Sequence, residues 1–213
     1  KARGALSVAH QIPQHKRHLG ITAASAGNHA IAAAWAAQQL GLSAKVVMQS
    51  SANPFRIARA RAHQAEVVLK PAGAATFGEA ERLVQEEGRT FIHPFEGLDT
   101  TLGTAGVGLE FLTDVPDLDA LVIAVGGGGL ISGVAAAAKL MKPDCKVYGV
   151  EPVGAASMSQ SLIKGEPVTL DSTSTIADSL APPMALPFGY ALCRAYVDQI
   201  VTVTDGEICA GMA

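Results

Sequence analysis

Short apolar runs alternate with longer helical patterns along most of this chain. Runs typical of buried strands cover residues 19–24, 44–48, 66–69, 90–92, 119–125, 146–150 and 199–203. Patterns that favour helices cover residues 1–9, 30–40, 76–87, 100–112, 130–139 and 187–195, and further helices begin at 54 and 205. Strands alternating with helices form parallel sheets that are buried on both faces. The pattern therefore predicts an α/β protein with open, mostly parallel, doubly wound sheets and helices on both faces of each.

A loop at residues 93–97, His-Pro-Phe-Glu-Gly, interrupts this alternation near the middle of the chain. The segments before and after it each have the pattern of a small wound sheet. We therefore predict a division at this loop, with a ligand cleft between the two parts.

Four consecutive glycines, Gly126, Gly127, Gly128 and Gly129, join the strand at 119–125 to the following helix. Backbone N–H groups that converge at a helix N-terminus favour a phosphate, and a tight packing turn is the alternative. The run does not fit the G-x-G-x-x-G dinucleotide pattern, because Ile131 and Ser132 stand where the third glycine is required, and no P-loop lysine follows. The glycines thus predict an anion site without naming the anion.

Residues 25–29, Ser-Ala-Gly-Asn-His, form the polar turn of a second strand–turn–helix unit. The hydroxyl, amide and imidazole of this turn lie at the N-terminus of a helix, which suits a carboxylate or phosphate. An ordinary N-cap by Ser25 or Asn28 is the alternative.

Two further places in the chain carry groups that could bind a ligand. Glu151 ends another strand and is either a polar or ion ligand or a helix-capping carboxylate. His15 and His18 could supply half of a metal site, but a surface loop at 10–18 is favoured.

Composition narrows the function classes. The chain has 213 residues, 49% of them hydrophobic, and a net charge of −3, so it offers no basic field for nucleic acid or anionic lipid, and Arg56, Arg59 and Arg61 read as a solvated helix face. No apolar run reaches the roughly 20 residues of a membrane span. Three separated cysteines suit a cytoplasmic protein. The start at Lys1 and a last helix without its body predict a fragment of a longer protein.

Three segments together resemble the fold-type II pyridoxal-phosphate enzymes, in particular the threonine (serine) dehydratase and serine racemase branch. They are residues 1–5, Lys-Ala-Arg-Gly-Ala, residues 25–29, and residues 126–130, Gly-Gly-Gly-Gly-Leu. Residues 93–95, 150–152 and 175–178 add weaker matches, so the resemblance covers nearly the whole chain.

This resemblance implies a role for each matching segment. Lys1 would bind pyridoxal 5′-phosphate covalently and move the substrate Cα proton, and Asn28 would hydrogen-bond the pyridoxal 3-oxygen. The backbone of Ser25, Ala26, Gly27, Asn28 and His29 would bind the substrate carboxylate. Gly126 to Gly129, with Leu130, would hold the cofactor phosphate. It also implies a homo-oligomer, with residues 1–18 and 98–213 in a larger cofactor-binding domain and 19–97 in a smaller domain.

Individual residues favour one reaction within this family. Serine racemases have a serine hydroxyl where this chain has Ala26, so the resemblance implies a dehydratase that converts a β-hydroxy amino acid such as L-threonine or L-serine to a 2-oxo acid and ammonia. His29 argues against cysteine synthases. Ser157 stands where the metal-binding branch has an acidic residue, so Glu151 is no more than a possible metal ligand. The alternatives are a phosphate-binding fragment without activity, a racemase and a β-replacement enzyme.

Overall fold

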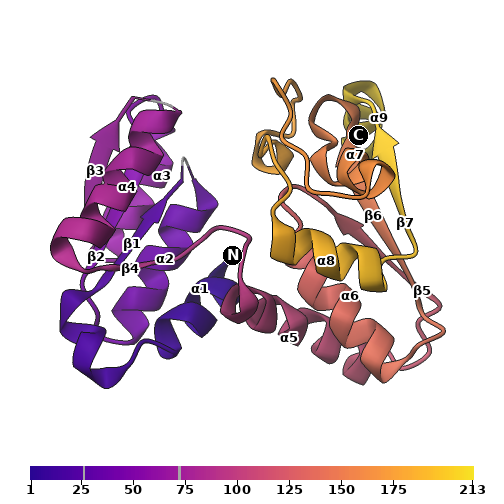
Figure 1. Cartoon of the computed structure of the whole chain (residues 1–213), viewed down its shortest axis with the longest axis horizontal. Coiled ribbons are helices and arrows are strands. Elements are labelled where there is room, and N and C mark those ends of the chain that lie inside the picture. Colours follow the sequence, from indigo (N-terminus) through magenta and orange to yellow (C-terminus); the bar gives the residue numbers. More distant parts are fainter. Residues whose placement is uncertain (26, 72) are drawn as a thin grey trace. The chain divides into compact units, whose positions relative to one another are not determined.

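A computed structural model of the chain describes residues 1–25, 27–71 and 73–213. It divides into two compact units, Lys1–Pro94 and Phe95–Ala213 (Figure 1). Both units alternate strands with helices, as the sequence predicts.

Unit 1 contains a four-stranded parallel sheet. Its strands are β1 (Ile21–Ala24), β2 (Ala44–Gln49), β3 (Glu66–Lys70) and β4 (Thr90–Phe91), in the order β3-β2-β1-β4. Its helices are α1 (Ala2–His10), α2 (Asn28–Gln39), α3 (Pro54–Ala62), α4 (Ala74–Glu87) and the 3-10 helix η1 (Gln14–Leu19).

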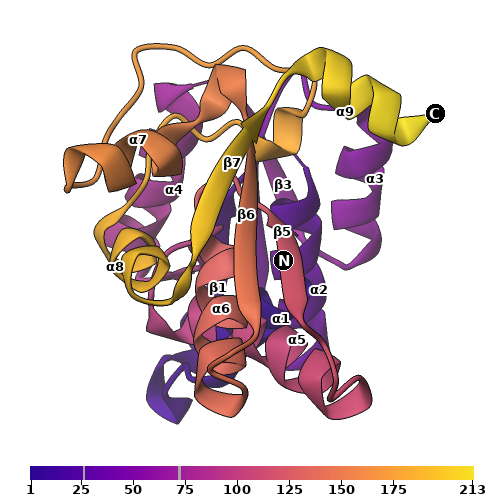
Figure 2. The ribbon, with the colours of Figure 1, turned by 90° about the vertical axis from the view of Figure 1, so that its right-hand side faces the viewer.

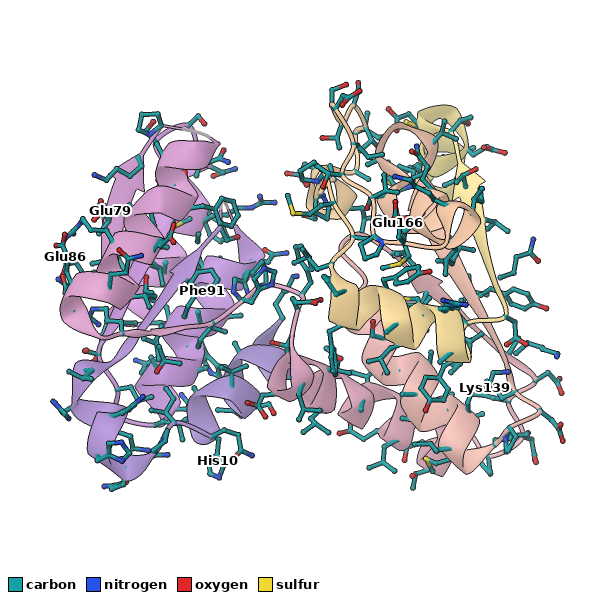
Figure 3. All side chains as sticks on the ribbon, viewed as in Figure 1. His10, Glu79, Glu86, Phe91, Lys139 and Glu166 are labelled. Carbon is teal, nitrogen blue, oxygen red and sulfur yellow. The ribbon has the colours of Figure 1, made fainter. Side chains whose placement is uncertain are left out.

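Helices cover both faces of the unit 1 sheet. The small alanine side chains of α2 allow close packing on β1 and β2, and α1 and α3 join the same apolar cluster. On the other face, Ala80 and Leu83 of α4 pack against Ala24 and Val47. The outer side of α4 is charged and carries Glu79 and Glu86 (Figure 3). Arg82 pairs with Glu79 at 2.7 Å and also with Glu86. This helix is therefore amphipathic, with one face in the core and one in water.

Unit 2 contains a three-stranded parallel sheet. Its strands are β5 (Ala120–Ala124), β6 (Lys146–Pro152) and β7 (Gln199–Val203), in the order β5-β6-β7 (Figure 2). Its helices are α5 (Leu98–Asp114), α6 (Gly129–Met141), α7 (Ser157–Lys164), α8 (Pro187–Tyr196) and α9 (Asp205–Met212), with 3-10 helices η2 (Val153–Ala155) and η3 (Asp178–Leu180).

Helix α6 is the centre of unit 2. Its buried residues Ile131, Val134 and Ala138 belong to the same apolar cluster as the inward side chains of β5 and β6. Two glycines bring α5 and α6 together: a Cβ at Gly108 would lie 2.8 Å from the Val134 carbonyl oxygen, and one at Gly133 would lie 2.5 Å from that of Thr101. Only glycine permits backbones to approach this closely.

The observed elements confirm the predicted α/β class and correct parts of it. Helix α2 begins at Asn28, two residues earlier than predicted, and α7 was not predicted. The predicted loop at 10–18 is wrong over its second half, because residues 14–19 form η1, where the Lys16 N–H donates to the Pro13 carbonyl oxygen at 2.8 Å. In this chain α1 packs on α2, and the assignment of residues 1–18 to a larger domain stays a prediction.

The structure also bears on membrane association. None of the helices in residues 1–25, 27–71 and 73–213 combines the length and the apolar character that a membrane span requires.

Candidate functional site

The turn before α2 places the predicted polar residues at a helix N-terminus. The N-cap is Gly27, without a side-chain cap, so the alternative of an ordinary N-cap by Ser25 or Asn28 is wrong. Ser25 Oγ instead accepts a hydrogen bond from the Gly27 N–H at 3.1 Å. A Cβ at Gly27 would lie 2.7 Å from a guanidinium nitrogen of Arg56, so this arginine is not simply part of a solvated face. Ala26 lies outside the described residues.

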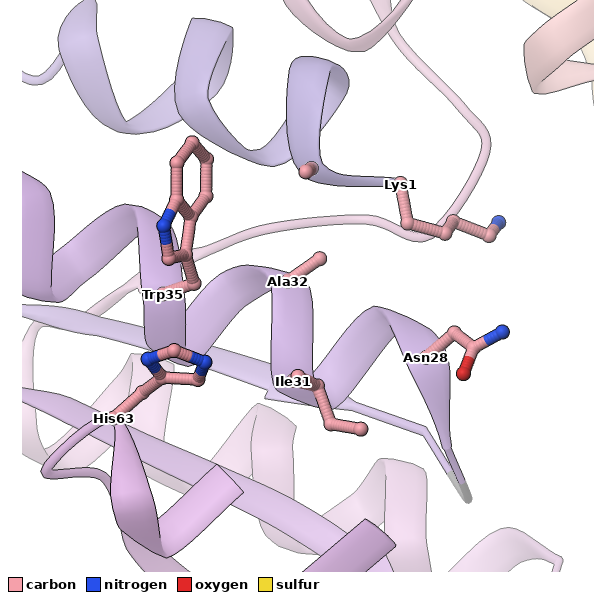
Figure 4. A pocket seen from close by; sticks show the side chains of 7 residues that line it. Lys1, Asn28, Ile31, Ala32, Trp35 and His63 are labelled. Atoms are coloured by element: carbon pink, nitrogen blue, oxygen red, sulfur yellow. The ribbon is translucent and has the colours of Figure 1, made fainter. Parts of the chain in front are cut away.

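Lys1 and Asn28 line one open pocket of about 500 Å³ in unit 1 (Figure 4). The pocket floor is mainly apolar and includes Ile31 and Trp35 of α2. Lys1 Nζ donates a hydrogen bond to the Pro94 carbonyl oxygen. Burial of the ammonium among protein atoms lowers the pKa of Lys1 below its usual value. A lysine with a lowered pKa retains more of the neutral, nucleophilic amine.

The ring of His29 is buried in unit 1 and hydrogen-bonds to the backbone of the segment that follows β4. Its side chain is 4% exposed, and Nε2 lies 2.8 Å from the Ile92 carbonyl oxygen. A carbonyl can only accept, so Nε2 carries the proton. Within the described residues, Nδ1 has no hydrogen-bond partner. The imidazole is therefore committed to the fold, which leaves the backbone of His29 for the predicted contact with a substrate carboxylate.

Two histidines make the stability of unit 1 sensitive to acid. Burial, the largest cause, lowers the pKa of His29 to about 3, and burial together with the charge of Lys1 lowers the pKa of His93 to about 4. In the unfolded chain both take up a proton near pH 6.5, before the folded chain does, so the unfolded state is favoured as pH falls.

We expect the free energy of unfolding to decrease from about pH 6.5 towards pH 3, by at most about 1.4 kcal/mol per pH unit for each histidine. Replacing His29 by glutamine should reduce this slope and leave the part that His93 contributes. Urea unfolding followed at several pH values measures it. An unchanged slope in the variant would show that His29 is not responsible.

The glycine run forms the junction between β5 and α6, as predicted. Gly128 is the N-cap of α6 and has φ +87°, a conformation that strongly favours glycine. The packing alternative also applies, because Cβ atoms at Gly127 and Gly129 would lie 2.4 Å and 2.6 Å from atoms of Phe95. Glycine is therefore required here for packing against Phe95, and the same bare backbone also suits an anion site.

Backbone donors are available at this junction. Helix α6 starts at Gly129, and the Ser132 N–H donates to the Gly128 carbonyl oxygen at 2.9 Å, so the N–H groups of Gly129, Leu130 and Ile131 precede the first i to i−4 hydrogen bond of the helix and have no such partner within it. Unpaired N–H groups at a helix N-terminus, together with the helix dipole, bind anions. Leu130 adds its own N–H, and its side chain is 44% exposed.

Two residues of the 93–97 loop, Phe95 and Glu96, have structural roles in unit 2 and were not predicted as site residues. Glu96 accepts hydrogen bonds from the N–H groups of Phe188 and Gly189 at 2.7 and 3.1 Å, and so caps α8. Phe95 packs on the glycines. Both lie in the predicted loop at 93–97, but only the structure shows what they contact.

Glu151 caps α7. Its carboxylate accepts hydrogen bonds from the N–H groups of Met158 and Ser159 at 2.9 and 2.8 Å and from Ser159 Oγ at 2.7 Å. Burial raises its pKa, while these hydrogen bonds oppose the rise. Of the two predicted roles of Glu151, the structure therefore agrees with the helix-capping carboxylate. Within the described part of the chain no group of three His, Cys, Asp or Glu residues could hold a metal ion.

Comparison with known proteins identifies the family. The model of the family described as "Pyridoxal-phosphate dependent enzyme" matches residues 1–213. The chain is 48% identical to phenylserine dehydratase from Ralstonia pickettii and 38% identical to L-threonine ammonia-lyase from Thermotoga maritima, covering 100% and 98% of this chain and 65% and 52% of the relatives. The structure of maize serine racemase matches with a TM-score of 0.96 at 33% identity, over 100% of this chain and 64% of that one.

These relatives agree with the resemblance inferred from the sequence. The chain spans about two thirds or less of the length of each of them. The predicted cofactor, pyridoxal phosphate, is confirmed as the cofactor of the family. The chain belongs to the family of pyridoxal-phosphate-dependent enzymes.

Proposed function

We propose that this chain provides the catalytic machinery of a pyridoxal-phosphate-dependent carbon–oxygen lyase. The reaction would convert a β-hydroxy amino acid to a 2-oxo acid and ammonia. The observation that carries the proposal is the similarity over the whole chain to relatives named as a dehydratase and an ammonia-lyase, at 48% and 38% identity.

The cofactor's phosphate is assigned to the glycine run. The N–H groups of the first turn of α6, which have no i−4 partner within the helix, and the positive end of the helix suit a phosphate, and the glycines themselves carry no side chain that would cover them. The residues present therefore fit this part of the cofactor.

Lys1 is assigned as the residue that binds the cofactor aldehyde and then acts as the base. Its lowered pKa suits both tasks, because a neutral amine is needed to attack an aldehyde and to accept a proton. Asn28 is assigned to the pyridoxal 3-oxygen, and the backbone of residues 25–29 to the substrate carboxylate. The N-terminus of α2 favours that carboxylate.

The bond changes follow from these roles. When bound, the cofactor withdraws the electron pair left on Cα. The substrate amine would replace Lys1 on the cofactor, which would free Nζ to take the Cα proton. The Cβ–O bond would then break, and the hydroxyl would leave as water with the proton that Lys1 had accepted. The resulting enamine would take up water and release ammonia and the 2-oxo acid.

The substrate is open to direct test. L-Threonine and L-serine are the substrates predicted from sequence, and phenylserine is suggested by the name of the relative at 48% identity. Turnover of the three by the cofactor-loaded chain should be measured as 2-oxo acid and ammonia formed. We expect equal amounts of both products from at least one substrate.

Other outcomes would identify the alternative functions. Inversion of serine without 2-oxo acid would indicate a racemase, and consumption of a thiol would indicate a β-replacement enzyme. Cofactor binding without turnover of any substrate would support a fragment that binds phosphate but has no activity. A homo-oligomeric state also stays a prediction.

A further inference from the structure

Two buried hydroxyl groups contact the carbonyl side of the glycine run. Thr104 Oγ1 of α5 lies 2.8 Å from the Gly129 carbonyl oxygen and 3.0 Å from that of Thr101. Ser132 Oγ of α6 lies 2.6 Å from the Gly128 carbonyl oxygen and 3.3 Å from that of Gly189. Their side chains are 7% and 0% exposed, so water does not replace them easily. Each hydroxyl has one proton to donate, and for both the shorter distance is the one to the glycine run.

Peptide geometry transmits these contacts to the other side of the loop. In a planar trans peptide the C=O and N–H groups point in opposite directions. The Gly128 carbonyl shares its peptide unit with the Gly129 N–H, and the Gly129 carbonyl shares its unit with the Leu130 N–H. A hydroxyl that holds each carbonyl therefore also orients an N–H of the first turn of α6, which has no i−4 partner within the helix.

Such support matters because the loop is glycine. Successive glycines have more conformational freedom than other residues, and ordering them for a ligand costs entropy. Donors that are oriented before binding avoid part of this cost. The Thr104 hydroxyl fits between α5 and α6 because residue 133 has no side chain. A Cβ at Gly133 would lie 2.2 Å from Thr104 Oγ1. Only glycine at 133 allows the Thr104 hydroxyl to reach the loop.

We propose that Thr104 and Ser132 are positioning residues that orient the N–H groups of Gly129 and Leu130 towards the cofactor phosphate. This rests on the proposed function, which assigns the phosphate to the glycine run. Neither side chain touches the phosphate, and each acts through the peptide unit that it holds.

The test removes each hydroxyl and compares a ligand with phosphate to one without it. Dissociation constants for pyridoxal 5′-phosphate and for pyridoxal are measured by absorbance titration in Thr104→Val and Ser132→Ala. Loss of one hydrogen bond predicts about fivefold weaker binding of pyridoxal phosphate in each variant. Pyridoxal binding should not change, because it has no phosphate.

The chain offers matched controls. Thr101 and Ser157 are also buried, and within the described residues their side-chain hydroxyls have no hydrogen-bond partner. Thr101→Val and Ser157→Ala should therefore bind pyridoxal phosphate like the unmodified chain. Thr104→Ser keeps a hydroxyl and should retain tight binding, which also covers the case in which the valine variant does not fold.

Three results would overturn the inference. Unchanged pyridoxal phosphate affinity in both test variants would show that the hydroxyls do not orient the donors. Equal weakening for both ligands would show a purely structural role. If the unmodified chain binds pyridoxal phosphate no better than pyridoxal, the phosphate assignment itself fails, and this inference fails with it.

Discussion

Replacing Lys1 by alanine is expected to lower turnover of the β-hydroxy amino acid by about 10³-fold or more, since one residue both binds the cofactor and moves the proton. The visible absorption band that pyridoxal phosphate gains when it bonds to a lysine should also disappear. Without Nζ neither the bond to the cofactor nor the proton transfer can occur, and in the unmodified chain the surrounding protein atoms desolvate the ammonium and lower the pKa of Lys1. Absorbance titration and product formation measure the two effects.

Two control variants separate chemistry from charge. Lys1→Arg keeps the positive charge but cannot form the bond, so it should lose activity as alanine does. Lys16→Ala removes an exposed lysine of η1 and should leave both measurements unchanged. The α-amine of residue 1 also has a lowered pKa, again mainly from burial. Borohydride reduction followed by peptide mapping shows which amine reacts, and retention of the band in Lys1→Ala would refute the assignment to Nζ.

Introducing a methyl group at Gly129 is expected to destabilise unit 2. An alanine Cβ would lie 2.6 Å from Phe95 Cα and 2.7 Å from the Phe95 carbonyl oxygen, so backbone would have to move. Overpacking of this kind costs about 1–3 kcal/mol, and more where the neighbour is backbone. The variant should also bind pyridoxal phosphate more weakly, because the phosphate loop would be displaced. Urea unfolding and absorbance titration measure the two losses.

Gly78 in α4 provides a control with the opposite sign. A Cβ there meets no heavy atom within 4 Å. Replacing a glycine inside a helix by alanine stabilises it by about 0.5–1 kcal/mol. Gly78→Ala should therefore raise the free energy of unfolding. Equal stability of Gly129→Ala and the unmodified chain would contradict the packing that the structure shows around Phe95.

Local patterns predicted most of the fold, because apolar periodicity reflects which faces are buried. The strand at 199–203 and the helix that starts at Pro54 after the N-cap Asn53 agree with the structure. Helix α7 was missed for a tertiary reason. Its first N–H groups are capped by Glu151, which precedes the helix at the end of β6, and such a cap leaves no signal within the helix sequence.

In the candidate site, too, the sequence indicated residue types and spacing but not contacts between distant residues. Lys1, Asn28 and the glycine run could be proposed from their residue types and spacing, since an amine, an amide and bare backbone each suggest a ligand group. The inward orientation of His29 could not, because it depends on the Ile92 carbonyl 63 residues away. Ser132 could have been singled out as a hydroxyl within an apolar helix, but its acceptor is visible only in three dimensions.

The close packing of α5 on α6 limits how these positions can change during evolution. Thr104 Oγ1 occupies the volume that any side chain at residue 133 would need. A side chain at 133 would also meet the backbone of α5, because its Cβ would lie 2.5 Å from the Thr101 carbonyl oxygen and 2.5 Å from the Ala105 nitrogen, so a smaller residue at 104 alone would not make room for it. Any residue larger than glycine at 133 would therefore push α5 away from α6, and the Thr104 hydroxyl would move away from the Gly129 carbonyl oxygen with it.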